Sequence, residues 1–416
     1  MNYNLQTIDE KTFTSYALNH NKYNVLQTSE TANRRSSNHL ILYLGLFNDD
    51  NLIGVGIFAG RSILFNYKEF DCRMGPLVDN NNIDLYLIFL NLATTYLKSY
   101  KGYRLLINPN EVINYYNNEL TINTDEAISK LRNKLKDNNY HEITNPLKEN
   151  SSYLNWYYFK DMSIFDNEEE LLKSIDNKAI RDIRYAQKNC VYVREIASNE
   201  FDIFEDCLNH TSERRHYDKR STQYYKELHQ LHQHNNSIKY MGAFLDTVKA
   251  IDELNSSINL EETLLTQLNE KGNGRKIINQ INECNIRLSS LYKRLEMLKN
   301  LPYKSDLLIS CAIFFIYPTE VIYFVSGSYS DTMIFNGVYL LLWEMLRFTY
   351  NNKIPLFNFY GTNGTFNNYP EQHGIYEFKR SFNGYLVEMI GYYYRDINYP
   401  VANIISILKK VKSIIK

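Results

Sequence analysis

The stretch GIYEFKRSFNG, residues 374–384, contains a lysine whose surroundings could give it a chemical role. Two of its aromatic residues, Tyr376 and Phe378, alternate, which predicts a strand with Tyr376, Phe378 and Arg380 on one face. Lys379 then lies on the opposite face of that strand. Its ammonium group is either a solvated charge near a turn or a cation directed at a ligand, and this segment alone does not separate the two.

A second group of cations recurs at helical spacing in NKAIRDIRYAQKN, residues 177–189. Arg181, Arg184 and Lys188 are three and four residues apart, and Lys178 adds a charge at the start of the expected helix. Such a stripe suits a ribose-phosphate backbone, because charge neutralisation supplies most of the affinity for nucleic acids. A solvated helix face is the alternative explanation.

A third basic segment, HTSERRHYDKRSTQYYKEL at 210–228, carries arginines just ahead of two tyrosines. The forked donors of arginine match phosphate oxygens, so this segment is suited to a ligand that carries a diphosphate. Ion pairing within the loop is the alternative. The residues concerned are Arg214, Arg215, Lys219, Arg220, Tyr224 and Tyr225, with Glu213 and Asp218 as the local acids.

Several classes of chemistry have no motif in this chain. It contains no Gly-x-Ser-x-Gly, no HExxH, no Walker loop and no GxGxxG between a strand and a helix. Its five cysteines are scattered and form no Cys/His cluster, so neither a disulfide framework nor a metal site is expected. With no secretory signal at its start, a reduced cytoplasm is the expected location.

The net charge of −1 means that a nucleic acid or a membrane must be bound by a local basic patch. The C-terminal segment NIISILKKVKSIIK, residues 403–416, is one candidate, because it combines apolar residues with lysines at helical spacing. It is expected either to dock on the protein itself or to lie on an anionic bilayer.

One order of elements occurs twice and is expected to position these groups. A hairpin at 40–60, a helix at 85–100 and a strand at 103–110 are repeated as a hairpin at 307–329, a helix at 338–352 and a strand at 355–361. The repeat predicts two related α/β lobes, each with a mixed sheet.

Residues 246–300 interrupt the second lobe with two leucine- and isoleucine-rich segments at three- and four-residue spacing. The intervening NEKGNGRK provides a reversal, which predicts an antiparallel helical hairpin packed as a coiled coil. We therefore expect a first lobe at 1–150, a second lobe at 151–245 and 301–416, and the hairpin at 246–300.

Several segments together resemble, in order and spacing, the Fem family of aminoacyltransferases. They are MGPLVD, TSERR with RSTQYY, VIYFVSGSYSDTMIFNGVYLLLWEM, FNFYG and EFKRSFNGYLVEMIGYYY. The resemblance covers nearly the whole chain and depends on collinearity rather than on one motif. The helical-hairpin insertion is similar to that of the FemA, FemB and MurM branch and not to the shorter FemX branch.

The resemblance implies an α/β fold of two acetyltransferase-like (GNAT-like) lobes with mixed sheets and the inserted hairpin. It also implies transfer of an amino acid, with Gly or Ser as the expected donor, from aminoacyl-tRNA to an amine of a peptidoglycan precursor. The acceptor would be the stem-peptide lysine or the end of a growing interpeptide bridge. The aminoacyl ester is already activated, so no metal, ATP or other cofactor is expected.

The expected partners are aminoacyl-tRNA and a lipid-linked precursor at the inner face of the membrane. Peripheral contact with that membrane is expected, as is a homodimer or an association with other Fem-like enzymes. Two alternatives are a non-catalytic protein that binds precursor or partner enzymes through the helical arm, and aminoacyl transfer to an amine outside peptidoglycan.

The resemblance assigns roles to individual residues. Phe378 and Lys379 match the catalytic pair of the family, in which the lysine would stabilise the ester oxyanion and the departing ribose oxygen. Contacts to the precursor are expected from Arg35, Tyr103, Asn108 and Arg220. Contacts to tRNA are expected from Lys178, Arg181, Arg184 and Lys188.

The chain also departs from the family pattern at three places. Met74 precedes Gly75 where many relatives have an Arg-Gly-Pro sequence, and Cys190 stands where a glycine usually follows the basic helix. Asn108 stands where some relatives keep a carboxylate near the acceptor. This last change weakens the hypothesis that a carboxylate at position 108 deprotonates the attacking amine.

Overall fold

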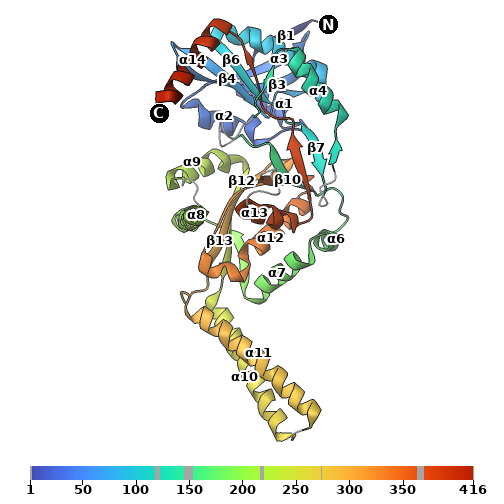
Figure 1. Cartoon of the computed structure of the whole chain (residues 1–416), viewed down its shortest axis with the longest axis vertical. Coiled ribbons are helices and arrows are strands. Elements are labelled where there is room, and N and C mark those ends of the chain that lie inside the picture. Colours follow the sequence, from blue (N-terminus) through green and yellow to red (C-terminus); the bar gives the residue numbers. More distant parts are fainter. Residues whose placement is uncertain are drawn as a thin grey trace.

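The computed structural model describes residues 2–117, 122–144, 153–215, 220–272, 274–362 and 370–415. Figure 1 shows a first lobe that carries both ends of the chain, a second lobe beside it, and a pair of long helices projecting from the second lobe. Each lobe is built on its own mixed sheet.

The sheet of the first lobe has the strand order β1-β2-β3-β4-β6-β17-β9, with β5 paired to β3. Its strands β4 and β6 are parallel, and the other pairs are antiparallel. The strands are β1 (Tyr3–Thr7), β2 (Leu40–Asn48), β3 (Asn51–Leu64), β4 (Tyr67–Arg73), β5 (Leu77–Val78), β6 (Gly102–Asn108), β9 (His141–Glu142) and β17 (Tyr393–Asp396).

The helices of this lobe are α1 (Glu10–Ala17), α2 (Ser29–Ser36), α3 (Ile83–Leu97), α4 (Glu126–Asp137) and α14 (Tyr399–Ile415). Asn82 begins α3 by accepting hydrogen bonds from the backbone N–H groups of Asp84 and Leu85, which is a typical N-cap. Buried Phe89 and Leu90 of α3 then pack with Phe58 of the sheet in the core of the lobe.

The sheet of the second lobe has the order β11-β12-β13-β14-β15-β10-β16-β7-β8, in which β14 and β15 are parallel. Its strands are β7 (Val112–Tyr116), β8 (Ile122–Thr124), β10 (Trp156–Asp161), β11 (Val191–Glu195), β12 (Ile238–Leu245), β13 (Leu307–Ile316), β14 (Glu320–Ser328), β15 (Leu356–Gly361) and β16 (Tyr385–Met389). Its helices are α6 (Glu168–Lys173), α7 (Asn177–Lys188), α8 (Phe201–Arg215), α9 (Thr222–His232), α12 (Gly337–Asn351) and α13 (Pro370–Arg380).

Both copies of the predicted hairpin–helix–strand order are confirmed. The first is β2-β3, α3 and β6, and the second is β13-β14, α12 and β15. Sheet membership does not follow the expected lobe boundaries throughout, however. Strands β7 and β8, which precede residue 150, join the second sheet, and β17 near the C-terminus joins the first. Pairing between such distant segments leaves no local pattern in the sequence.

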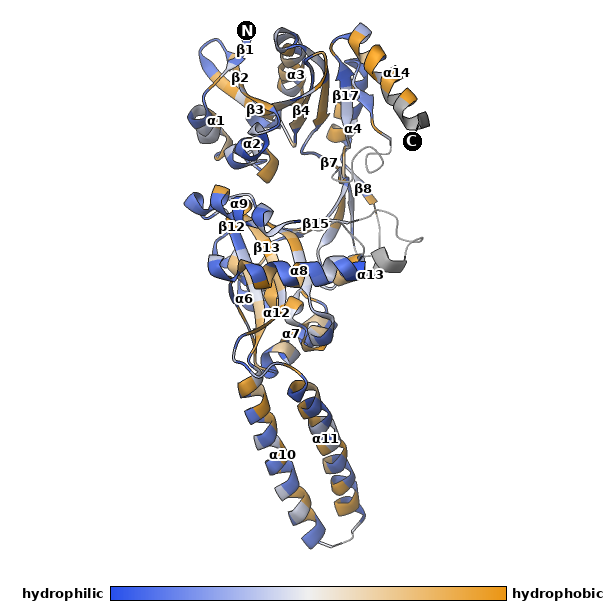
Figure 2. Ribbon diagram, turned by 90° about the vertical axis from the view of Figure 1, so that its left-hand side faces the viewer, coloured by the Kyte–Doolittle hydropathy of each residue, from blue (hydrophilic) through white to orange (hydrophobic). Residues whose placement is uncertain are grey.

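The predicted helical hairpin is confirmed as α10 (Thr247–Glu270) and α11 (Arg275–Lys299), which pack against each other along their length. Figure 2 shows apolar and polar residues alternating in bands along both helices. The buried positions form the seam of a coiled coil: Leu254, Ile258, Leu268, Cys284, Leu288, Leu295 and Leu298.

The predicted strand at 374–380 is wrong, because these residues form the C-terminal part of helix α13. Its buried side chains, Tyr376 and Lys379, are three residues apart, and buried Phe382 follows after another three. This is a helical period. Two alternating aromatic residues in so short a window fit a strand equally well, so the pattern could not separate the two.

Candidate active site

A cleft of about 590 Å³ lies between the two lobes. The first lobe contributes the loop from Asn21 to Leu26, helix α2 and the ends of strands β4 and β6. The second lobe contributes β10, β14, β15, the start of α9 and the end of β16. In mixed α/β folds such crevices at strand ends commonly bind ligands, so this cleft is the candidate site.

The described lining of the cleft includes four basic residues, Lys22, Arg34, Arg73 and Arg220. Arg34 of the first lobe donates a hydrogen bond to the Tyr224 hydroxyl of the second lobe, at 3.2 Å. The guanidinium carbons of Arg34 and Arg220 lie 5.8 and 5.4 Å from the centre of the Tyr224 ring. Both arginines are exposed, so this pair can receive an anionic ligand at the mouth of the cleft.

Two of the predicted precursor contacts lie elsewhere. Arg35 points away from the cleft lining and forms a bidentate ion pair with Asp71, at 2.8 and 2.5 Å. Tyr103 is fully buried beneath helix α14, and its hydroxyl donates to Glu69 at 2.8 Å. The structure therefore does not bring these two side chains to the site, whereas Arg34, one position before Arg35, does line it.

Asn108 is in the cleft wall as expected, at the end of β6, and is 4% exposed. The backbone N–H of Met74 donates to the Oδ1 atom of Asn108 at 3.2 Å and to its carbonyl oxygen at 2.9 Å. Met74 has a φ of 49°, in the left-handed region that non-glycine residues rarely adopt. Asn108 thus holds an unusual backbone turn at the rim of the cleft, a role that needs an acceptor but no charge.

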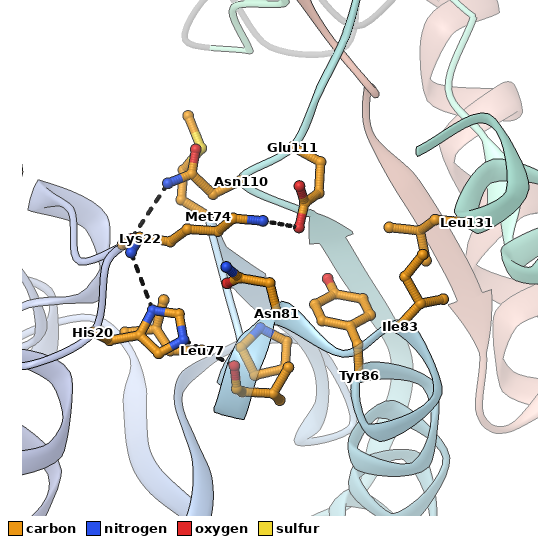
Figure 3. Close-up of a pocket in the computed structure, with 12 residues that line it drawn as sticks. His20, Lys22, Met74, Leu77, Asn81, Ile83, Tyr86, Asn110, Glu111 and Leu131 are labelled. Atoms are coloured by element: carbon orange, nitrogen blue, oxygen red, sulfur yellow. Dashed lines mark hydrogen bonds and ion pairs between the residues drawn. The ribbon is translucent and has the colours of Figure 1, made fainter. Parts of the chain in front are cut away.

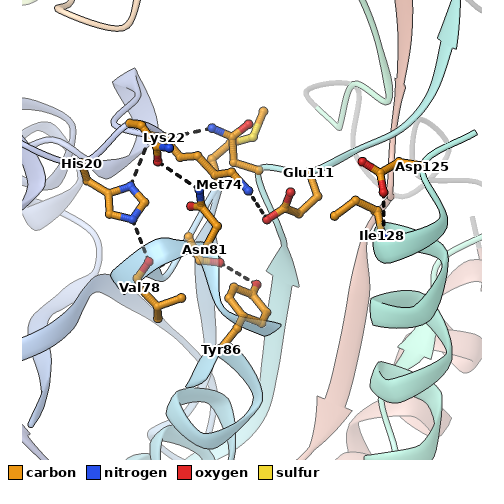
Figure 4. Close-up of polar contacts among 12 residues, drawn as sticks. His20, Lys22, Met74, Val78, Asn81, Tyr86, Glu111, Asp125 and Ile128 are labelled. Atoms are coloured by element: carbon orange, nitrogen blue, oxygen red, sulfur yellow. Dashed lines mark hydrogen bonds and ion pairs between the residues drawn. The ribbon is translucent and has the colours of Figure 1, made fainter. Parts of the chain in front are cut away.

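The loop that carries Lys22 is held in place by a cluster of polar contacts (Figures 3 and 4). The ammonium of Lys22 pairs with Glu111, and the backbone N–H of Lys22 donates to His20 Nδ1 at 3.1 Å. His20 Nε2 lies 2.9 Å from the carbonyl oxygen of Val78, and burial lowers the pKa of His20, so the ring is neutral near pH 7 and donates through Nε2. These contacts surround a cavity of about 20 Å³, enough for one water molecule.

Lys379 lies directly behind the cleft wall and is 5% exposed. Its ammonium donates to the carbonyl oxygens of Tyr360, at 3.2 Å, and of Gly361, at 2.5 Å. Tyr360 itself lines the cleft. Burial lowers the pKa of Lys379 to about 7, because the charged form loses its hydration. The group can therefore hold or release a proton near neutral pH.

Phe378 does not face the cleft lining but packs on helix α12. Its ring makes T-shaped contacts with Tyr339 and Phe382, at centroid distances of 5.2 and 5.8 Å. A second buried lysine, Lys160 of β10, donates to Ser174 Oγ and to the carbonyl oxygens of Phe382 and Asn383, at 2.8 to 3.0 Å. The ring contacts of Phe378 and the hydrogen bonds of Lys160 both hold the end of α13 and so fix the position of Lys379.

The basic helix α7 presents all four predicted cations to solvent: Lys178, Arg181, Arg184 and Lys188 are exposed. Its opposite face buries Ala179, Ile183 and Ala186 against α12. Just beyond the helix, Arg294 of the arm donates to Asn189, and Cys190 contacts Glu253 of the arm at 3.3 Å. The arm is thereby held in a fixed position next to the basic stripe.

The chain thus consists of two mixed-sheet lobes and a helical arm, with a cation-lined cleft between the lobes and a buried lysine behind the cleft wall. The crystal structure of FemX has the same fold: it superposes with a TM-score of 0.76, covering 97% of this chain and 99% of FemX at 17% identity. The predicted fold class is confirmed by this likeness.

Sequence comparisons assign the family. The FemAB family model matches residues 8–410, so the chain belongs to the FemAB family. It is 25% identical over 390 residues to the aminoacyltransferase FemA of Staphylococcus epidermidis, covering 91% of each chain. It is 27% identical over 387 residues to FemA of Staphylococcus aureus, covering 90% of each chain. The prediction that this chain is an aminoacyltransferase is confirmed.

Proposed function

We propose that this enzyme transfers an amino acid from aminoacyl-tRNA to an amine of a peptidoglycan precursor. The acceptor is the stem-peptide lysine or the end of a growing interpeptide bridge, and Gly or Ser is the donor. One observation carries the proposal: the cation-lined cleft is separated by a single residue, Tyr360, from the buried ammonium of Lys379. An anion-binding surface and a group suited to an oxyanion thus adjoin each other.

In this mechanism the diphosphate of the precursor binds Arg34 and Arg220, which both lie near the ring of Tyr224. The amine attacks the carbonyl carbon of the tRNA ester, and negative charge develops on the carbonyl oxygen. A preorganised ammonium at Lys379 stabilises this oxyanion and the departing ribose oxygen. Its two carbonyl partners keep it oriented without neutralising its charge.

The tRNA binds the exposed cations of α7 and the adjoining base of the arm. A groove of about 480 Å³ runs between the end of α7 and the two arm helices. Its charged lining is mixed: Lys188 and Arg294 are available for phosphates, whereas Arg287 is paired with Glu261, and Glu253 also lines the groove. Phosphate contacts of this kind give affinity without sequence readout, which suits recognition of a tRNA body.

We also propose that the enzyme works in the cytoplasm, in peripheral contact with the membrane that holds its acceptor. No helix within the described ranges has the length and apolar character to cross a bilayer. Helix α14 docks through Ala402 and Ile405 but leaves other apolar side chains 47 to 61% exposed, namely Tyr399, Ile404, Ile407, Leu408 and Val411. An amphipathic helix with lysines at positions 409, 410 and 412 suits an anionic surface.

Flotation with phosphatidylglycerol vesicles tests this contact. The wild type should float with these vesicles and not with phosphatidylcholine vesicles, and Ile404→Glu with Ile407→Glu should abolish flotation. A matched double change on the other side of the first lobe, Leu18→Glu with Leu40→Glu, should leave it intact, since these apolar residues are also exposed. Equal flotation of both variants would contradict the contact.

The helical arm favours a second interaction, with another copy of this chain or a related enzyme. Its exposed apolar side chains include Leu260 and Ile286, at 72 and 70% exposed. Light scattering during gel filtration should show a dimer that Leu260→Glu with Ile286→Glu dissociates. A monomer at micromolar concentration would restrict the arm to tRNA or to a different partner.

The transfer reaction is tested with purified enzyme, a lysine-containing lipid precursor and tRNA charged with each radiolabelled amino acid in turn. Label should enter the precursor from Gly-tRNA or Ser-tRNA. Transfer to a non-peptidoglycan amine alone would redirect the proposal to a different acceptor. Binding of charged tRNA without turnover, for every donor and bridge length, would identify a non-catalytic binding protein instead.

A further inference from the structure

Glu320 opens strand β14 at the junction of the two lobes and lines the cleft. It is the one acidic residue in the described lining, which otherwise carries four cations. The turn before it is anchored across the junction, because Thr319 donates a hydrogen bond to the carbonyl oxygen of Tyr23 at 2.6 Å. The carboxyl group of Glu320 is therefore held at a fixed place in the candidate site.

A chain of hydrogen bonds connects Glu320 with Lys379. The side chain of Asn358 donates to Glu320 Oε2 at 2.7 Å, and its Oδ1 atom accepts from the backbone N–H of Tyr360 at 2.7 Å. The carbonyl oxygen of Tyr360 in turn accepts from Lys379. Tyr360 has a φ of 65°, so the backbone is held in a strained turn at the point where this chain passes through it.

The surroundings of Glu320 leave its charge state open near neutral pH. Burial raises the pKa of this carboxyl group to about 7, and the hydrogen bond from Asn358 opposes the rise. The ionisable groups beside it are Tyr157 of β10 and Tyr317 of the turn, whose own pKa values burial raises well above the usual range, so both are neutral. The other charged residues of the described lining are Lys22 and Arg73, which pair with Glu111 and Asp71, and the exposed Arg34 and Arg220.

We propose that Glu320 receives the ammonium group of the acceptor and takes its proton, acting as the general base of the transfer. This inference rests on the proposed function. A neutral amine is required for attack, and Glu320 is the one acidic residue in the described lining that can attract a substrate ammonium and accept its proton. Asn108 of the first lobe has no carboxylate, so the carboxylate that acts as base comes from the second lobe instead.

The proton balance of the step is complete. One proton of the acceptor ammonium passes to the Glu320 carboxylate and later to solvent. The free amine forms the C–N bond, and the C–O bond to the ribose breaks. A second proton of the amine passes to the ribose oxygen, which leaves as a hydroxyl group. Lys379 stabilises the oxyanion between these events and keeps its own proton over the cycle.

The pH dependence of kcat/KM tests the assignment, with each ionisation tied to one variant. The wild-type profile should be bell-shaped and centred near pH 7, because Glu320 must be deprotonated and Lys379 protonated. Glu320→Gln should lower kcat by about 100-fold or more and remove the limb on the acid side. Asn358→Ala should move that limb to higher pH, because this variant removes a donor that favours the carboxylate.

Glu344→Gln provides the control, since this half-exposed carboxylate lies on α12 outside the cleft lining and pairs with Arg347. A Glu320→Gln enzyme that transfers within threefold of wild type, or that keeps the acid limb, would overturn the inference while the proposed function stands. A wild type that transfers nothing would overturn both. Circular dichroism spectra of the variants establish that they are folded, and Asn358→Ala tests the same ionisation independently.

Discussion

The two lobes repeat one order of elements but bring different chemistry to the cleft they share. In the first lobe, strand β6 ends at Asn108, whose side chain is used to hold the backbone of Met74. In the second, the corresponding strand β15 ends in a left-handed turn at Tyr360, whose carbonyl oxygen is directed at Lys379. The first lobe thus supplies a rigid rim and three of the four cations in the described lining, namely Lys22, Arg34 and Arg73. The second lobe supplies Arg220 and the groups suited to proton transfer and oxyanion stabilisation.

The largest effect is expected from removal of the Lys379 ammonium in the second lobe, which tests the proposed roles of the two lobes. Lys379→Ala should lower kcat by about 10²–10³, because the oxyanion no longer has this preorganised donor. Lys379→Arg should lower kcat nearly as much, since a planar guanidinium does not fit a buried site that holds a compact ammonium. Exposed Lys173 on α6 is the control, and Lys173→Ala should be unchanged in a single-turnover transfer assay. Residual transfer within threefold of wild type in Lys379→Ala would place the chemistry elsewhere.

The next largest effect is expected from the arginines at the mouth of the cleft, and it should appear in KM rather than in kcat. Arg34→Ala and Arg220→Ala should each raise KM for the precursor about tenfold, because each removes a charge-assisted contact worth about 1.5 kcal/mol or more. Arg35→Ala, on the same helix as Arg34, should leave KM unchanged and instead lower Tm, since half-buried Asp71 loses its bidentate partner. An increase in KM for Arg35→Ala alone would reverse the assignment of these neighbours.

These neighbours also show what sequence reasoning could and could not reach. The resemblance to the Fem family predicts a precursor contact from Arg35, but sequence alone does not say which of the two adjacent arginines, Arg34 or Arg35, faces the cleft. Successive residues of a helix point about 100° apart, and the choice is made by Asp71 on a strand 36 residues away. Arg220 and Asn108, by contrast, line the cleft, and their contacts with the precursor stay a prediction.

Local patterns predicted the hairpins, the arm and the basic helix because each is set by residues close in sequence. Glu320 and Lys160 were missed, since a glutamate at a hairpin turn and a lysine in a strand carry no signal of burial. A charged residue inside an otherwise aromatic strand such as WYYFKD was the available hint for Lys160. The register of β10 between β15 and β16, which buries Lys160, depends on pairings between residues 195 to 232 positions apart in the sequence.

A smaller effect is expected outside the cleft, on helix α7. Arg181→Ala and Arg184→Ala should each weaken tRNA binding, because each removes a charge that neutralises a phosphate. The slope of log Kobs against log salt should then fall by about 0.7–0.9 for each phosphate that is no longer neutralised. Filter binding at several salt concentrations between about 50 and 200 mM measures this slope.

Transfer at saturating tRNA should be unaffected in both α7 variants, because these exposed side chains lie away from the cleft lining. An unchanged salt slope would mean that these cations form a solvated helix face and do not bind tRNA.

The smallest effect concerns stability and separates the two buried lysines. Burial lowers the pKa of Lys379 to about 7 from its usual 10.5, so between these values the unfolded chain binds more protons than the folded chain. The contribution of Lys379 to the free energy of unfolding therefore rises with pH across this window. Lys379→Met leaves the carbonyl oxygens of Tyr360 and Gly361 without their donor, but it also removes a larger cost of charge burial than at Lys160, because the pKa of Lys379 is lowered further. Its Tm should therefore equal or exceed that of the wild type at pH 7, and the difference should shrink toward pH 10.

Lys160→Met is the matched comparison, because burial lowers the pKa of Lys160 as well, to about 8. Its ammonium has three hydrogen-bond partners that fasten the end of α13, and the substitution leaves the carbonyl oxygens of Phe382 and Asn383 without this donor. Its Tm should therefore fall at pH 7. A fall of equal size in Lys379→Met would mean that both lysines serve the fold. Opposite signs would mean that the second lobe retains Lys379 at a cost in stability, which chemistry at the cleft explains.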